Sequence, residues 1–213
     1  MDTSYKTVQQ EASDEFVEKR SRFIGYCKPV TTEEEALEFI NRIKSKHWDA
    51  RHNVYAYCLR EGQIKRYSDD GEPQGTAGMP VLDVLLKSEL TDLVVVVTRY
   101  FGGILLGTGG LVRAYSDATQ KGIENCIKVQ KVDGIEIEIV LDYANLEIFK
   151  YYCKNNDINI TKVEYGENIV LKIEMEKNRK NTFVKDIETK TLIIKEYQVL
   201  QEKYINKTVG KNK

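Results

Sequence analysis

The sequence lacks long apolar runs and paired cysteines. Its longest apolar runs, such as residues 93–97, are far shorter than the about 20 residues that a membrane-spanning helix needs, and residues 1–10 are too polar for a signal peptide. The four cysteines lie far apart, with no Cys-x-x-Cys pair that would indicate a zinc site. We therefore expect a cytoplasmic protein with reduced thiols, no membrane contact and neither disulfide nor zinc.

A surplus of charge of either sign is also lacking. The chain has 32 lysines and arginines against 33 aspartates and glutamates, which gives a formal net charge of -1. Domains that bind nucleic acid through a broadly basic surface have high isoelectric points. Any affinity for RNA must therefore come from a local basic patch. With 213 residues, the chain is long enough for one or two domains with buried cores.

Glycine, by contrast, is concentrated in residues 98–115 (TRYFGGILLGTGGLVRAY). The apolar run at residues 93–97 predicts a strand buried on both faces, and helical spacing begins at Leu111. This stretch is therefore predicted to be a strand, a glycine turn and a helix. Its spacing matches neither the dinucleotide fingerprint, because Val112 stands where that motif needs glycine, nor the kinase-type phosphate loop, because no Gly-Lys-Ser/Thr follows.

Two interpretations of the glycine turn remain open. Glycine could permit close packing of the strand against the helix. Alternatively, free amides at the helix start could bind an anion with help from the helix dipole. Tyr100 and Phe101 are then either stacking platforms or core residues. The second interpretation gives the following candidate phosphate-binding residues: Arg99, Gly102, Gly103, Gly107, Thr108, Gly109, Gly110 and Arg113.

A second distinctive stretch, residues 68–80 (SDDGEPQGTAGMP), contains three carboxylates. Grouped carboxylates could hold magnesium through hard oxygen ligands. The same letters are typical of a turn whose side chains hydrogen-bond the backbone, so we favour a turn and expect no metal and no other cofactor. Arg113 could also pair with one of the aspartates. The secondary candidates for the site are Arg51, His52, Asp69, Asp70 and Glu72.

The remaining amino-terminal elements follow from periodicity and capping. Residues 14–29 are predicted to form one strand with a basic, solvated centre. A capping box at Thr32 and Glu35 opens a helix, and residues 52–67 form a hairpin. Pro80 lies in the first turn of a further helix.

Beyond Cys126 the composition changes to lysine and glutamate alternating with isoleucine. This change predicts a first domain at residues 1–128 and a second at residues 132–205. Apolar periodicity in the second domain predicts the order βαββαβ, which is the split pattern of ferredoxin-like domains. Residues 206–213 are predicted to be a polar tail.

Three segments together resemble a known family. Arg51-His52, residues 69–80 and residues 98–115 closely resemble motifs of the IMPACT/YigZ family, over roughly residues 19–126. The resemblance implies an α+β fold whose first domain is similar to domain 2 of ribosomal protein S5, with a four-stranded sheet and two helices on one face, and to domain IV of elongation factor G. The second domain resembles the ferredoxin-like domain of bacterial members and domain V of the same factor.

The resemblance also implies a role in translation or stress. Eukaryotic members restrain the amino-acid-starvation kinase by competing for its activator, through regions that include an RWD domain, which we expect this chain to lack. Our leading hypothesis is a non-enzymatic regulator that binds RNA or the ribosome through the glycine and arginine turn. The alternatives are an enzyme, either a hydrolase or a phosphotransferase, with acid–base groups among His52 and the acidic loop, and a protein-interaction module without affinity for RNA.

Overall fold

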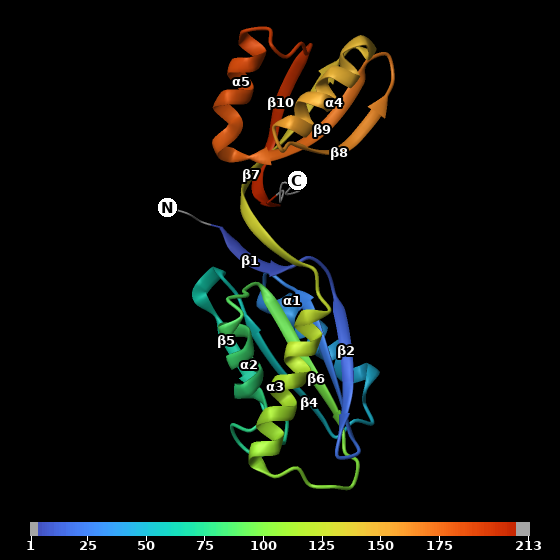
Figure 1. The fold of residues 1–213 in the computed structure, drawn as a ribbon, viewed down its shortest axis with the longest axis vertical. Helices are drawn as coiled ribbons and strands as arrows, with labels where there is room; N and C mark the ends of the chain where they lie inside the picture. Colours follow the sequence, from blue (N-terminus) through green and yellow to red (C-terminus); the bar gives the residue numbers. More distant parts are fainter. Residues whose placement is uncertain (1–3, 208–213) are drawn as a thin grey trace. The chain divides into compact units, whose positions relative to one another are not determined.

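The structure, a computed structural model, describes residues 4–207 and divides the chain into two compact units (Figure 1). The first unit is Tyr5–Val129, and the second begins at Gln130 and also includes Ser4. Each unit has its own sheet and its own buried apolar core. The α+β fold class expected from the sequence is confirmed. Of the predicted polar tail, residues 208–213 lie outside the described residues.

The first unit is built on a five-stranded antiparallel sheet rather than the four-stranded sheet that the resemblance implied. The strand order is β2-β3-β6-β4-β5. β6 is central, and every residue from Leu93 to Arg99 is buried, as the apolar run predicted. The strands of this unit are β1 (Tyr5–Val8), which lies outside the five-stranded sheet, β2 (Ala12–Glu18), β3 (Ser21–Pro29), β4 (His52–Cys58), β5 (Lys65–Ser68) and β6 (Leu93–Tyr100).

Residues 14–29 do not form the single strand that their pattern predicted. They belong to β2 and β3, which form a hairpin that closes where Glu18 pairs with Ser21. Lys19 and Arg20 make the two-residue turn, with φ values of 45° and 64°. Positive φ at both positions is what a type I′ hairpin turn requires. Since neither residue is glycine or asparagine, the turn has no sequence signal.

Helices cover both faces of this sheet (Figure 1). α2 (Gly78–Lys87) and α3 (Thr108–Glu124) pack on one face, as expected, and α1 (Glu33–Lys46) packs on the other. The predicted cap of α1 is present, because Thr32 Oγ1 accepts a hydrogen bond from Glu35 N at 3.2 Å. The Glu35 carboxylate instead accepts from Thr31 N at 2.6 Å.

The second unit is a ferredoxin-like domain, as predicted. Its antiparallel strands have the order β10-β7-β9-β8. Side chains of α4 and α5 share one core with alternate residues of β7 and β9, so both helices cover the same face. The elements are β7 (Lys128–Leu141), α4 (Leu146–Asn155), β8 (Asn159–Tyr165), β9 (Ile169–Glu176), α5 (Lys180–Glu188) and β10 (Glu196–Asn206). Single 3₁₀ turns lie at Glu61–Gln63, Tyr143–Asn145 and Lys177–Arg179.

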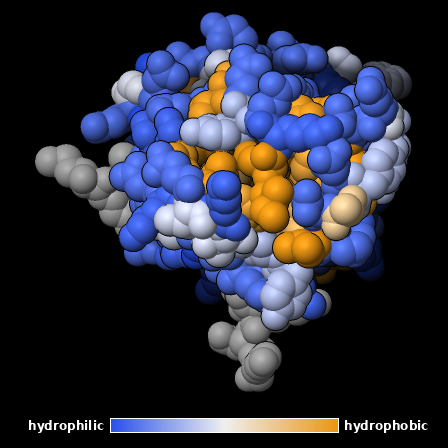
Figure 2. Space-filling model, turned by 90° about the horizontal axis from the view of Figure 1, so that it is seen from above, coloured by the Kyte–Doolittle hydropathy of each residue, from blue (hydrophilic) through white to orange (hydrophobic). Residues whose placement is uncertain are grey.

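Some apolar side chains of the second unit remain exposed. The large exposed side chains of this unit include Tyr143, Ile148, Tyr151, Tyr165 and Ile193. Figure 2 shows hydrophobic residues gathered within a mainly hydrophilic surface.

Within residues 4–207, no helix combines the length and apolar character needed to span a bilayer.

Candidate functional site

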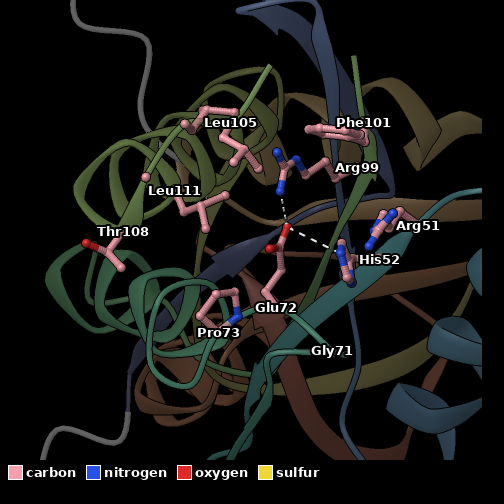
Figure 3. A pocket seen from close by; sticks show the side chains of 12 residues that line it. Arg51, His52, Gly71, Glu72, Pro73, Arg99, Phe101, Leu105, Thr108 and Leu111 are labelled. Atoms are coloured by element: carbon pink, nitrogen blue, oxygen red, sulfur yellow. Dashed lines mark hydrogen bonds and ion pairs between the residues drawn. The ribbon is translucent and has the colours of Figure 1, made fainter. Parts of the chain in front are cut away.

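The candidate site lies in the first unit, where four segments converge (Figure 3). These segments are the start of β4, the end of β6, the loop between β5 and α2, and the start of α3. Together they enclose a hollow of about 390 Å³. The three segments that were distinctive in the sequence therefore meet. The lining residues are Arg51, His52, Gly71, Glu72, Pro73, Arg99, Phe101, Leu105, Leu106, Gly107, Thr108 and Leu111.

Strand register explains why His52 and Arg99 meet. His52 of β4 pairs directly with Arg99 of β6, and Arg99 pairs with Phe23 of β3 on its other side. Directly paired residues of an antiparallel sheet point to the same face. The Arg99 guanidinium accordingly lies 5.4 Å from the centre of the Phe23 ring, on the sheet face that α2 and α3 cover.

Glu72 is the buried centre of the site. Its Oε1 accepts hydrogen bonds from Arg99 Nη1 at 2.5 Å and from the Tyr115 hydroxyl at 2.8 Å. The side chains of Glu72 and Arg99 are only 4% and 6% exposed. Burial, and then the negative charge of Glu72, raise the pKa of Tyr115 far above its usual value. The phenol therefore stays protonated and donates to the carboxylate.

Arg99 retains donor capacity after these contacts. Its Nη2 lies 3.5 Å from Ser21 Oγ, which also accepts from Gly102 N at 3.2 Å. Its Nε is buried and has no hydrogen-bond partner in the part of the chain that the structure describes. A buried donor without a partner costs about 1–3 kcal/mol.

A hydrogen bond to the backbone carbonyl group of Asp70 fixes the orientation of the His52 ring. Its Nδ1 lies 2.8 Å from the carbonyl oxygen of Asp70. Because a carbonyl can only accept, Nδ1 carries a proton, and in a ring with a single proton Nε2 is the acceptor. Glu72 Oε1 lies 3.8 Å from Nε2, beyond hydrogen-bonding distance. In Figure 3, the His52 ring faces Glu72 across the hollow.

The glycines of the turn serve different purposes. A Cβ at Gly102 would lie 2.0 Å from the backbone of Arg20, so close packing requires glycine there. Gly107 has φ of 73° and directly precedes α3, whose first turn carries no acidic residue and no side-chain cap. A Cβ at Gly103, Gly107 or Gly109 would meet no atom within 4 Å. The start of α3 is therefore open.

The two aspartates of the acidic loop hold backbone and lysine groups. Asp69 accepts from the backbone N–H groups of Gly75, Ala77 and Gly78 at 2.9, 3.1 and 2.8 Å. Asp70 accepts from Asn53 N at 2.6 Å and from Lys44 Nζ at 2.7 Å. These side-chain-to-backbone bonds are those that the turn interpretation predicted. Across the described residues, no group of three His, Cys, Asp or Glu side chains is suited to a metal ion.

Arg113 and Gly110 do not line the main hollow. Both line a separate hollow of about 170 Å³, together with Asp117. Phe101, in contrast, is 40% exposed at the main hollow. The guanidinium carbons of Arg99 and Arg51 lie 5.5 and 5.9 Å from the centre of its ring.

Sequence reasoning missed Tyr115 and Ser21. Tyr115 lies on the apolar stripe of the helix whose spacing begins at Leu111, and its ring is fully buried. The available signal was its polar tip, because a buried tyrosine hydroxyl usually has a hydrogen-bond partner. Ser21 had no signal, since its position against Gly102 depends on the unpredicted hairpin.

Comparison with known proteins gives two matching family models. The Impact N-terminal domain matches residues 19–123, and a domain of unknown function (DUF1949) matches residues 139–191. The two matches fall in the first and second units respectively.

Individual relatives extend over most of the chain. The chain is 40% identical over 181 residues to the IMPACT family member YvyE of Bacillus subtilis, which covers 84% of this chain and 83% of that protein. It is 34% identical over 160 residues to the IMPACT family member YigZ of Escherichia coli, with 74% and 78% covered. A crystal structure of a hypothetical protein, 28% identical, superimposes with a TM-score of 0.61 over 95% of this chain and 100% of that one.

Proposed function

The chain belongs to the IMPACT family, and from this premise we propose that it is a translation-associated regulator that binds RNA or the ribosome through the hollow at the start of α3. The translation part rests on the family, whose two domains resemble domains of a ribosomal protein and of elongation factor G. The RNA part rests on the geometry of the hollow.

One observation carries the RNA part: the uncapped start of α3 opens beside a buried arginine with an unused donor. α3 has 17 residues, no acid in its first turn and no side-chain cap. Helix starts of this kind bind phosphate through free amides and the helix dipole. Arg99, a side chain that can only donate hydrogen bonds and whose buried Nε has no partner among the described residues, lines the same hollow, which also favours an acceptor-rich ligand.

Three exposed cations lie at the hollow or close to the glycine turn. Arg51 lines the hollow, the backbone of Arg20 packs against Gly102 of the glycine turn, and Lys19 lines the separate hollow that contains Arg113. All three basic side chains belong to exposed residues. They supply the local basic patch that a chain with a net charge of -1 needs in order to attract a polyanion.

Thr108→Asp tests the proposal by putting a carboxylate where the phosphate would lie. An acid in the first turn of a helix is stabilising by about 0.3–1 kcal/mol, so the fold should be retained. We expect binding to ribosomal RNA fragments, measured by filter binding across a salt series, to weaken strongly. Thr108→Asn, similar in shape but uncharged, is the matched control and should bind nearly as the wild type does.

Arginine substitutions locate the surface. Arg51→Ala should lower the slope of log affinity against log salt by about 0.7–0.9, the value for one lost phosphate contact. Arg113→Ala, outside the hollow, should leave the slope unchanged. A wild-type chain without RNA affinity at low salt would end the proposal and favour the protein-interaction module. If Arg51→Ala and Arg113→Ala lower the slope by equal amounts, RNA does not bind specifically at this hollow.

A further inference from the structure

We propose that His52 makes the hollow selective for ribose: its Nε2 accepts a hydrogen bond from the 2′-hydroxyl of a nucleotide whose phosphate lies at the start of α3. The predicted consequence is a preference for single-stranded RNA over DNA of the same sequence. This inference rests on the proposed function, since it assumes that the hollow binds a nucleotide phosphate.

The hollow contains hydrogen-bond donors, which suit a phosphate, and one hydrogen-bond acceptor, which suits a hydroxyl group. Arg51, Arg99 and the α3 amides can only donate, which suits a phosphate. His52 Nε2 can accept, because the Asp70 carbonyl fixes the proton on Nδ1. Arg99 Nη1 and His52 Nε2 lie 2.5 and 3.8 Å from the same atom, Glu72 Oε1. Arg99 and His52 therefore lie next to each other in the wall of the hollow.

The acceptor at His52 needs a hydrogen-bond donor from the ligand. Glu72 Oε1 does not supply one, since it accepts hydrogen bonds from Arg99 and Tyr115. A phosphate oxygen cannot supply one either. A ribose 2′-hydroxyl can, and it is the group that distinguishes RNA from DNA. DNA would leave Nε2 without a partner after displacing water, which is costly in a binding site.

The size and walls of the hollow suit one nucleotide. Its volume of about 390 Å³ falls in the range of small-ligand sites, about 300–1,000 Å³. One wall is apolar and exposed, with Leu105 82% and Phe101 40% exposed. The Phe101 ring could stack on a base, which is sequence-tolerant.

The test compares single-stranded RNA and DNA of identical sequence by fluorescence anisotropy with the full chain at low salt. We expect RNA to bind about three- to tenfold more tightly, the value of one hydrogen bond. RNA with 2′-fluoro groups, which cannot donate, should bind like DNA. Ribose 5-phosphate, as a competitor, tests whether a free sugar phosphate offers the same chemistry.

Two His52 variants separate binding from folding. His52→Asn keeps a donor for the Asp70 carbonyl but has no acceptor at the position of Nε2. It should remove the preference for RNA, so that the variant binds RNA and DNA of the same sequence with equal affinity. His52→Gln, whose amide oxygen can reach that position, should restore part of the preference. Circular dichroism and urea denaturation report whether the fold is intact.

Each other outcome overturns a different statement. Equal affinity of the wild-type chain for RNA and DNA, or an equal loss of both in His52→Asn, overturns the role of His52 and leaves the proposed function standing. Competition by ribose 5-phosphate at concentrations as low as the oligonucleotide would assign the hollow to a small sugar phosphate and overturn the RNA assignment. No binding of either oligonucleotide would overturn the proposed function itself.

Discussion

In the first unit, several side chains that are charged or can become charged are buried, and burial disfavours charge. Glu72 and Arg99 are both removed from water, so their attraction must offset the cost of desolvation, and the Tyr115 hydroxyl helps to do so. His47 is also buried, with Nε2 2.7 Å from the Tyr26 hydroxyl and Nδ1 2.8 Å from the Tyr100 hydroxyl. Both clusters make testable contributions to stability.

Tyr115→Phe should destabilise the first unit by about 1.5–3 kcal/mol, the range for a hydrogen bond to a charged group. The ring and its edge-to-face contact with Phe23 would remain, so the loss reports on the bond to Glu72. Urea denaturation followed by circular dichroism measures the change. Tyr67→Phe, at a residue 42% exposed, is the control and should stay within about 0.5 kcal/mol of the wild type. Equal effects of the two substitutions would contradict the buried bond.

His47 should make stability fall in mild acid. Burial, followed by the charges of Lys46 and Arg22, lowers the pKa of His47 in the folded state. As the pH falls below about 6.5, the unfolded chain therefore takes up a proton more readily than the folded chain. The contribution of His47 is fully present above about pH 6.5 and is lost as the pH falls toward the lowered pKa.

His47→Gln is the variant that isolates this effect. Its unfolding free energy, measured by urea denaturation between about pH 7 and pH 5, should fall less steeply than that of the wild type. Other titrating groups are common to both chains and cancel in the comparison. Parallel pH profiles would show that His47 is not the responsible group.

At the level of elements, prediction succeeded where the signal was local. The buried run of β6, the cap of α1 and the β4–β5 hairpin each depend on a few neighbouring residues, and all three are present. The β2–β3 turn failed because Lys19 and Arg20 adopt positive φ without glycine or asparagine. Such a conformation is imposed by pairing between the two strands.

The site shows the same division between local and long-range information. The sequence motifs identified Arg51, His52, Glu72 and Arg99, which meet in one hollow. Their roles could not be predicted, because the register between β4 and β6 decides that His52 and Arg99 share a face. The same motif also suggested Arg113, but one turn of α3 carries it into a different hollow.

Asp69 should be the main stabiliser at the start of α2. Its carboxylate accepts three backbone N–H bonds there, from Gly75, Ala77 and Gly78, although Ala77 itself provides no side-chain cap. Asp69→Ala should cost about 1–2 kcal/mol or more, measured by urea denaturation. Asp83→Ala, at an exposed position of the same helix, is the matched control. If both substitutions lower the free energy of unfolding by the same small amount, Asp69 is not the main stabiliser at the start of α2.

At the scale of the whole molecule, the two units have separate cores. The first unit has apolar core clusters on both faces of its sheet, and the core cluster of the second unit lies on the face that α4 and α5 cover. The composition change near Cys126 reflects this difference. Strands covered on one face alternate apolar with charged residues, as β7 and β9 do.

Core substitutions should therefore act on one unit at a time. Leu85→Ala in α2 and Ile173→Ala in β9 each remove a fully buried side chain and should cost about 2–5 kcal/mol. Hydrogen exchange measured by mass spectrometry should show lost protection in residues 5–129 for the first variant and in residues 130–207 for the second. Loss of protection throughout the chain in either variant would mean that the units unfold together.

The buried pair of Glu72 and Arg99 also restricts how this sequence can diverge during evolution. Changing either residue alone leaves an unpaired charge in the interior, which costs about 3–5 kcal/mol. This is a large share of the about 5–15 kcal/mol that stabilises a typical domain. Replacing both together with apolar residues of similar volume is often neutral. Selection therefore acts on the two positions jointly, and lineages descending from this chain can lose the pair only through coupled substitutions.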